Sequence, residues 1–159
     1  MAVNAYLIID GVPGPSTSLK DAHDILSFSW GVSNTAVIGA GSSGGEARSG
    51  RANMSDLSIM KVADKNTPLM FANCCNGTFI KKVDIIYDKP MGDKQEPYFK
   101  IHMEDVLITS HQVSGSSENP VESHSYAYTK IKVSYNPEEE GKLKGFIDRG
   151  WDAGALVKW

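Results

Sequence analysis

The sequence predicts a mainly β fold: a small β-barrel of two packed antiparallel sheets with one short α-helix on the outside. Three observations favour this class. Apolar residues stand mostly in short alternating segments that are bounded by turn-forming residues. A single segment, residues 64–82, carries both start and stop signals for a helix. The 159 residues suffice for one domain with a sizeable core, so we expect residues 1–159 to form a single domain.

The first strands are expected at residues 5–10 and 24–30, where side chains of different character alternate. The dipeptides DG and PG that follow the first segment are strong turn signals. In the second segment, the alternation predicts Leu26, Phe28 and Trp30 on the core face. The opposite face of that strand is expected to be small and partly polar.

Glycine and serine dominate residues 31–51, and almost no apolar residue follows Ile38. This composition predicts a long mobile loop without a packed element, and such a loop in a compact domain indicates a functional role. The loop contains GAGSSG after an apolar trio, which matches a dinucleotide-binding motif. That motif requires a helix after the glycines, and the polar residues that follow predict none, so we favour a flexible loop.

The helix is predicted within residues 64–82. Thr67 is expected to be its N-cap, a proline follows at the first helical position, and Gly77 is placed to end the helix in the left-handed conformation. Cys74 and Cys75 are neighbours that point about 100° apart on a helix. We therefore expect them not to pair with each other but to be small buried residues.

Further strands are predicted after the glycine-rich loop and after the helix. They are residues 53–61, 80–88, 98–103, 106–111, 123–135 and 142–151. The longest, 123–135, places Ile131 and Val133 on one face. The other face, expected to be exposed or to contact another subunit, holds Tyr126, Tyr128, Lys130 and Lys132. A nucleic-acid stacking platform is the alternative for this face, but no basic patch supports it.

Charge and composition exclude several classes of function. The 16 basic residues against 19 acidic ones give a net charge of −3, so nucleic-acid binding is not expected. Apolar runs never approach the roughly 18 residues that a membrane span requires, so membrane insertion is not expected. The N-terminus lacks the pattern of a signal peptide, and export would therefore need another route.

No catalytic, cofactor-binding or metal-binding set is predicted. The histidines are isolated in the sequence, at His23, His102, His111 and His124. No serine stands in a GxSxG motif, and two adjacent cysteines fall short of the four ligands of a structural zinc site. Glu104 and Asp105 are neighbours on a predicted strand, where they would point to opposite faces and not act as an acid/base pair.

A series of short motifs runs in one order along nearly the whole chain. The motifs are MAV at residues 1–3, IDGVPG at 9–14, ILSFSWG at 25–31, DKNTPL at 64–69, Gly77, EDVLITS at 104–110, YTKI at 128–131, Tyr135 and GWD at 150–152. Together they resemble the haemolysin-coregulated protein (Hcp) family, the tube protein of the bacterial type VI secretion system. No single motif is decisive, but their order is specific.

The resemblance implies a structural subunit and not an enzyme. Proteins of this family form hexameric rings that stack into a tube, which carries effectors, is surrounded by a contractile sheath, is tipped by a spike protein and is expelled from a Gram-negative cell. The expected partners are therefore other copies of the chain, effector proteins, the sheath and the spike, with no cofactor. The protein would be cytoplasmic before firing and then secreted to the medium or a target cell by a signal-peptide-independent route. No domain is expected after the barrel, so a fused toxin form is not expected.

The resemblance also indicates two sites. The expected ring-stacking contact is the glycine-rich loop, with Gly39, Gly41, Gly44, Gly45, Glu46, Arg48 and Arg51. Ser27 and Ser29 fit a lumen wall that contacts effectors, and an ordinary solvent face fits them equally well. The alternative function is a stand-alone β-barrel ligand-binding module or enzyme with residues 39–51 as a lid. The tail at residues 153–159 departs from the family pattern and ends in an exposed-looking Trp159.

Overall fold

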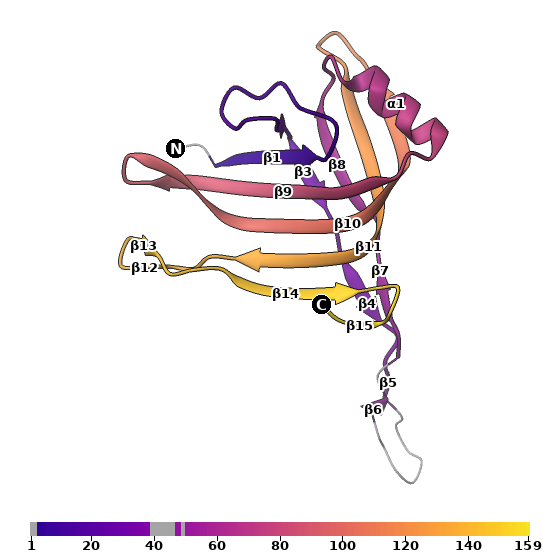
Figure 1. The fold of residues 1–159 in the computed structure, drawn as a ribbon, viewed down its shortest axis with the longest axis vertical. Coiled ribbons are helices and arrows are strands. Elements are labelled where there is room, and N and C mark those ends of the chain that lie inside the picture. Colours follow the sequence, from indigo (N-terminus) through magenta and orange to yellow (C-terminus); the bar gives the residue numbers. More distant parts are fainter. Residues whose placement is uncertain (1–2, 39–46, 49) are drawn as a thin grey trace.

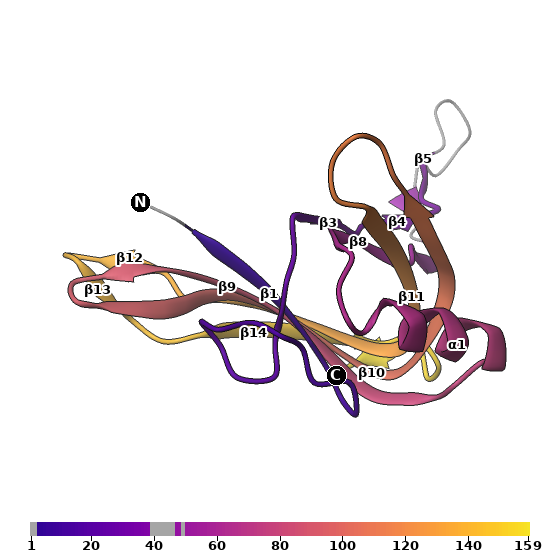
Figure 2. The same cartoon turned by 90° about the horizontal axis from the view of Figure 1, so that it is seen from above.

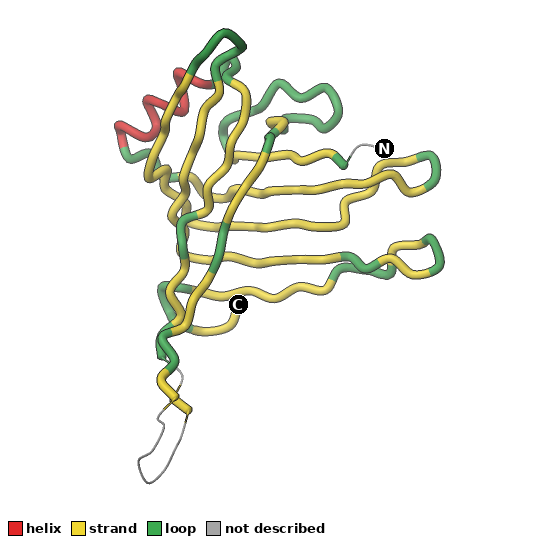
Figure 3. Tube along the Cα trace, turned by 180° about the vertical axis from the view of Figure 1, so that it is seen from behind, coloured by secondary structure: helices red, strands yellow, loops and turns green. Residues whose placement is uncertain are grey.

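The computed structural model describes residues 3–38, 47–48 and 50–159, and strands dominate its regular secondary structure (Figure 1, Figure 3). The described helix is α1 (Thr67–Asn76). The strands before it are β1 (Asn4–Ile9), β2 (His23–Asp24), β3 (Ser27–Ser29), β4 (Val32–Asn34), β5 (Val37–Ile38), β6 (Ala47–Arg48), β7 (Ala52–Met54) and β8 (Leu57–Val62). Those after it are β9 (Ile80–Met91), β10 (Lys94–Ser114), β11 (Val121–Tyr135), β12 (Glu138–Glu139), β13 (Lys142–Leu143), β14 (Ile147–Asp152) and β15 (Val157–Lys158). The mainly β class with one short helix is confirmed.

Nine of these strands pair into one branched sheet. Its order is β15-β14-β11-β10-β9-β1-β2, and β8 pairs additionally with β11 and β3. The two expected layers therefore belong to one hydrogen-bonded sheet, because β11 pairs with β14 through residues 130–135 and with β8 through residues 121–126. Among the described strands the path runs from β15 to β2, and no hydrogen bonds close it into a barrel.

The strands β10 and β11 turn sharply between these two regions (Figure 1, Figure 2). Along β10, Ile101 and Met103 are buried before the turn, and Val106 and Ile108 are buried after it. The inward side chains thus change from odd to even positions. Asp105, which lies between the two pairs, has φ of 56°, outside the extended region, so the alternation changes face at this residue.

This change of face explains two differences from the sequence-based expectations. Residues 98–103 and 106–111 belong to one bent strand, β10, and not to two strands. Tyr126 was expected on an exposed face but is fully buried. Its half of β11 presents the even positions to the core, whereas the half that contains Ile131 presents the odd ones.

The hydrophobic core lies between the layers. Leu7 of β1 and Ile85 of β9 belong to one buried cluster with Leu57 and Ile59 of β8. Phe28 of β3 packs against β9 and β10. Its ring centroid lies 5.5 Å from that of Tyr87 and 6.0 Å from that of Phe99.

The expected inward face of residues 24–30 is partly wrong. Leu26 is 59% exposed, and Ile25 is buried in its place. The segment is not one strand but β2 and β3, which pair with different partners, so the alternation is interrupted between them. Phe28 and Trp30 do face the core and are half-buried against it.

The helix begins one residue earlier than expected. Its N-cap is Asn66, and Thr67 is already helical, so the prediction of Thr67 as N-cap is wrong. The Thr67 hydroxyl instead accepts a hydrogen bond from the backbone N–H of Asp64 at 3.0 Å. Gly77 has φ of 63°, and its N–H bonds to carbonyls of the last turn, which confirms the predicted left-handed stop.

The buried face of α1 is narrower than the sequence suggests. Met70 is buried and Cys74 is half-buried against the core, but Cys75 is exposed, contrary to expectation. The helix is also short, and no helix in the described part of the chain has the length and apolar composition needed to cross a membrane.

The C-terminal tail packs on the outer side of the sheet. The Trp159 ring stacks on His102 with centroids 5.9 Å apart, and the ammonium groups of Lys130 and Lys132 lie over it. At Gly150, a Cβ would lie 2.7 Å from the Trp159 carbonyl oxygen, so this close approach requires glycine. Trp159 is therefore half-buried and not exposed.

Candidate functional site

The segment expected to be a loop without a packed element is in part a two-stranded arm. β4 pairs with β7, and β5 pairs with β6. These short ribbons extend from the body of the protein on the side away from α1 (Figure 1). The expectation was wrong because strands of two or three residues that pair only with each other are too short to leave an alternating apolar pattern in the sequence.

Two polar clamps hold the described part of the arm. The Ser55 hydroxyl accepts from the N–H of Gly31 at 2.9 Å and donates to its carbonyl at 2.8 Å. The Asn34 amide bonds both the N–H and the carbonyl of Gly50, at 2.9 and 3.2 Å. A Cβ on Gly50 would lie 2.1 Å from the Thr35 carbonyl oxygen, so this position requires glycine.

The predicted stacking residues divide between the described arm and the part of the chain that the structure does not describe. Outside the described residues lie Gly39, Gly41, Gly44, Gly45 and Glu46. Arg48 pairs with Val37 through the backbone, and Arg51 is exposed next to the Asn34 clamp.

A second surface, which we call the serine face, is formed where β3, β8, β11 and β10 lie side by side. One row of directly paired residues is Ser29, Ser58, Ser125 and Ser110. The next row is Ser27, Met60, Ser123 and Gln112. The hydroxyl oxygens of Ser58 and Ser125 are 3.1 Å apart. Ser27 and Ser29 are exposed, so both predicted residues lie on an uncharged surface that crosses four strands and consists mostly of serines, with Met60 and Gln112 between them.

An apolar groove of about 310 Å³ lies where the base of the arm meets β11 and β14. Its lining residues are Trp30, Val32, Ala52, Met54, Ile131, Val133, Arg149, Gly150 and Trp151. Large apolar side chains are also exposed elsewhere, among them Leu69 and Phe71 of α1 and Ile147 of β14. Such surfaces on a small protein are typical of contacts with other chains.

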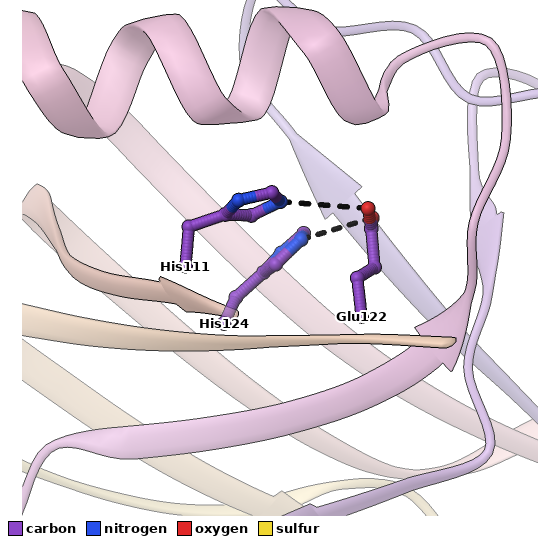
Figure 4. A group of neighbouring side chains, drawn as sticks. All are labelled: His111, Glu122 and His124. Atoms are coloured by element: carbon purple, nitrogen blue, oxygen red, sulfur yellow. Dashed lines mark hydrogen bonds and ion pairs between the residues drawn. The ribbon is translucent and has the colours of Figure 1, made fainter. Parts of the chain in front are cut away.

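A cluster of buried polar side chains lies beneath α1 (Figure 4). Lys61 of β8 stands directly opposite Glu122 of β11, and its ammonium lies 3.0 Å from Glu122 Oε1 and 2.8 Å from Asp64 Oδ2. His124 Nε2 lies 2.9 Å from the same Glu122 oxygen, and His111 Nε2 lies 3.4 Å from Oε2. The side chains of Lys61 and Glu122 are 2% and 0% exposed.

Hydrogen bonding in this cluster fixes the charge of its central carboxylate. Burial alone would raise the pKa of Glu122, but the neighbouring His124, Thr67 and Lys61 side chains hold that pKa well below its usual range. Burial lowers the pKa of His124, and its bond to Glu122 offsets this only in part. Neutral His124 therefore donates from Nε2 to Glu122 and accepts at Nδ1, 2.9 Å away, from the Tyr126 hydroxyl. Burial raises the pKa of Tyr126, so the phenol keeps its proton.

The sequence-based reasoning missed this cluster by treating each histidine as isolated. The signal that could have found it is the i, i+2 spacing of Glu122 and His124, which places both on one face of a strand. Pairing of β10 with β11 then sets His111 directly opposite His124. The Glu104 and Asp105 pair brings no such site, since Asp105 is the exposed left-handed residue of the turn in β10.

Comparison with known proteins gives one consistent result. A family model described as "Type VI secretion system effector, Hcp" matches residues 6–135. The chain is 30% identical over 156 residues to Protein hcp1 of Pseudomonas aeruginosa, which covers 96% of both chains.

Solved structures agree with the sequence matches. The chain is similar to a structure described as a type six secretion system protein, with a TM-score of 0.88 and 27% identity over 99% of this chain and 100% of that one. Hcp1 from Salmonella typhimurium shares the fold, with a TM-score of 0.81 and 22% identity over 100% of both chains.

Proposed function

The chain belongs to the Hcp family of type VI secretion system proteins, and on this premise we propose that it is a subunit of the inner tube of that system. In this proposal it forms hexameric rings that stack, carry effectors in their lumen and are secreted. Proteins of this family are structural and secreted, and they are not enzymes, which sets aside a β-barrel enzyme with a lid. The observation that carries the proposal is the match to Protein hcp1, which spans 96% of both chains.

The surface of the single chain supports self-association. A ring requires two different surfaces that fit each other around a closed axis. The apolar groove at the base of the arm offers one surface that a neighbouring copy can cover, and the open sheet edges at β15 and β2 offer others. We propose that residues 1–159 act as a single domain in this assembly.

We propose that residues 39–51 make the contact between stacked rings, with Arg48 and Arg51 in the described part of the chain and Gly39, Gly41, Gly44, Gly45 and Glu46 outside it. This assignment is supported by the position of the β4–β7 and β5–β6 ribbons, which leave the body of the protein (Figure 1). Further proposed partners are the contractile sheath and the spike protein.

We propose that the serine face, with Ser27 and Ser29, lines the lumen and contacts effectors. Small hydroxyl side chains present neither a large apolar area nor a charge, so they can lie against different cargo without binding any one tightly. In this proposal the protein is cytoplasmic before firing and leaves the cell by a signal-peptide-independent route.

Native mass spectrometry and sedimentation velocity test the ring directly. A hexamer of the 17.3 kDa chain has a mass of about 104 kDa, and electron microscopy of that species should show rings. A protein that stays monomeric at high concentration would refute the proposed assembly.

A further inference from the structure

The cluster beneath α1 leaves two groups without partners. The His111 side chain is 3% exposed, and neither of its ring nitrogens has a hydrogen-bond partner in the described part of the chain. Among the described residues Glu122 Oε2 is also buried without a hydrogen-bond partner, and His111 Nε2 lies 3.4 Å from it. Buried polar atoms are rarely left without partners, so this pair calls for an explanation.

The geometry points to a binding site for a divalent transition-metal ion such as Zn²⁺, held by His111, Glu122 and His124. One ligand atom from each residue lies within 4.8 Å of the others. In a tetrahedral zinc site with bonds of about 2.0–2.1 Å, neighbouring ligand atoms are about 3.3 Å apart, close to the 3.4 Å between His111 Nε2 and Glu122 Oε2. Figure 4 shows the three side chains converging on one point below the helix.

The surrounding groups are those that support a metal ligand. Lys61 and His124 lie against Glu122 Oε1 and leave Oε2 free, and Asp64 at 2.8 Å balances the charge of the Lys61 ammonium. His124 Nδ1 is 2.9 Å from the Tyr126 hydroxyl. When a metal takes Nε2, the imidazole proton moves to Nδ1 and is donated to the Tyr126 oxygen, the second-shell bond that ligating histidines usually make.

The chemistry of the donors selects the class of ion. Two imidazoles and one carboxylate suit Zn²⁺, Co²⁺ and Ni²⁺ better than Mg²⁺ or Ca²⁺, which prefer oxygen ligands. Three protein ligands leave a fourth position for water. The His111 ring lies 6.4 Å from the ring of Phe71, measured between centroids, and Phe71 is itself exposed, so the site lies close beneath the surface. The inference does not depend on the proposed tube function.

Metal titration of the full-length, tag-free protein tests the site. After removal of metal with EDTA and then of the chelator, CoCl₂ is titrated with absorption spectroscopy, and ZnCl₂ is titrated with calorimetry. One equivalent should bind, and Zn²⁺ should raise the melting temperature. His111→Gln should weaken binding by at least about tenfold, since a ligand is lost. It should keep the fold, because His111 makes no hydrogen bond that folding would lose.

His102→Gln is the matched control. His102 lies on the same strand but contacts Asp84 and Glu104 outside the cluster, so this variant should bind the metal as the wild type does. The inference is overturned if the wild type binds no ion at about 1 mM ZnCl₂. It is equally overturned if His111→Gln binds as well as the wild type, or if His102→Gln is the variant that loses binding.

Discussion

Replacing Lys61 by methionine should destabilise the protein more than any surface ion-pair change. The substitution keeps the volume and the apolar stem but removes the ammonium that lies 2.8 Å from Asp64 and 3.0 Å from Glu122. Glu122 is fully buried and remains ionised, because its pKa is held low. The variant therefore leaves a buried carboxylate with one fewer compensating partner.

The expected magnitude follows from burial. Removing one partner of a buried ion pair costs about 3–5 kcal/mol. Glu122 still accepts a hydrogen bond from His124 at 2.9 Å, so we expect the lower end, about 3 kcal/mol. For a domain of this size, each kcal/mol lowers the melting temperature by about 2–4 °C, which predicts a fall of about 6–12 °C.

Thermal and urea unfolding followed by circular dichroism measure this loss. The samples contain EDTA and are compared at one protein concentration, because the apparent stability of an assembling protein depends on it. Lys89→Met is the matched control, since Lys89 also lies 2.8 Å from a carboxylate, Glu138, but these side chains are 22% and 41% exposed and not buried. Its melting temperature should stay within error of the wild type.

Two results test this account of the buried Lys61–Glu122 pair. The double variant Lys61→Met with Glu122→Gln should recover part of the loss, because the uncompensated charge is then absent, and a double-mutant cycle gives the coupling. If Lys61→Met melts no lower than Lys89→Met, the buried pair does not stabilise the fold and our account of the cluster is wrong.

Three further predictions concern assembly and the helix. Deletion of residues 41–50 should spare ring formation but impair stacking, as seen by electron microscopy, and loss of the rings would show that the arm has another role. Ser29→Arg should leave the hexamer intact in sedimentation and reduce co-purification of effectors, because it places a large charged group on the serine face; unchanged co-purification would place that face away from the cargo. Gly77→Ala should lower the melting temperature by about 2–4 °C, because φ of 63° costs a non-glycine residue about 1 kcal/mol, and an unchanged melting temperature would contradict the left-handed stop.

The parts of the fold that the sequence predicted are those set by local rules. The strand at residues 5–10 and the glycine stop at Gly77 depend on alternation and on backbone conformation, which neighbouring residues determine. The bend in β10 was not predictable, because Asp105 looks like an ordinary polar strand residue. The exposure of Leu26 was missed for a similar reason, since it follows from β2 and β3 pairing with different strands.

The candidate sites were likewise predictable only where they depend on local sequence. The serine face could be anticipated at Ser27 and Ser29, but its extension over other strands depends on registers between distant segments. The cluster beneath α1 was missed because His111 and His124 become neighbours only when β10 pairs with β11. The sequence of β11 alone shows the Glu122 and His124 pair, but it does not show Lys61 of β8, which lies opposite Glu122.

The branched sheet also has a consequence for synthesis of the protein. β8 is made early, yet Leu57 pairs with Tyr126 and Val62 with Val121, so this strand has no long partner until β11 has left the ribosome. Pairing between segments so far apart in the chain slows folding, because a large loop must close before any contact forms. Until then β3 and β8 form at most a short ribbon, and the edge of β8 that later pairs with β11 is open to wrong pairing. In the proposed ring, assembly would therefore begin from completed chains, and nascent chains would need these early strands to be protected.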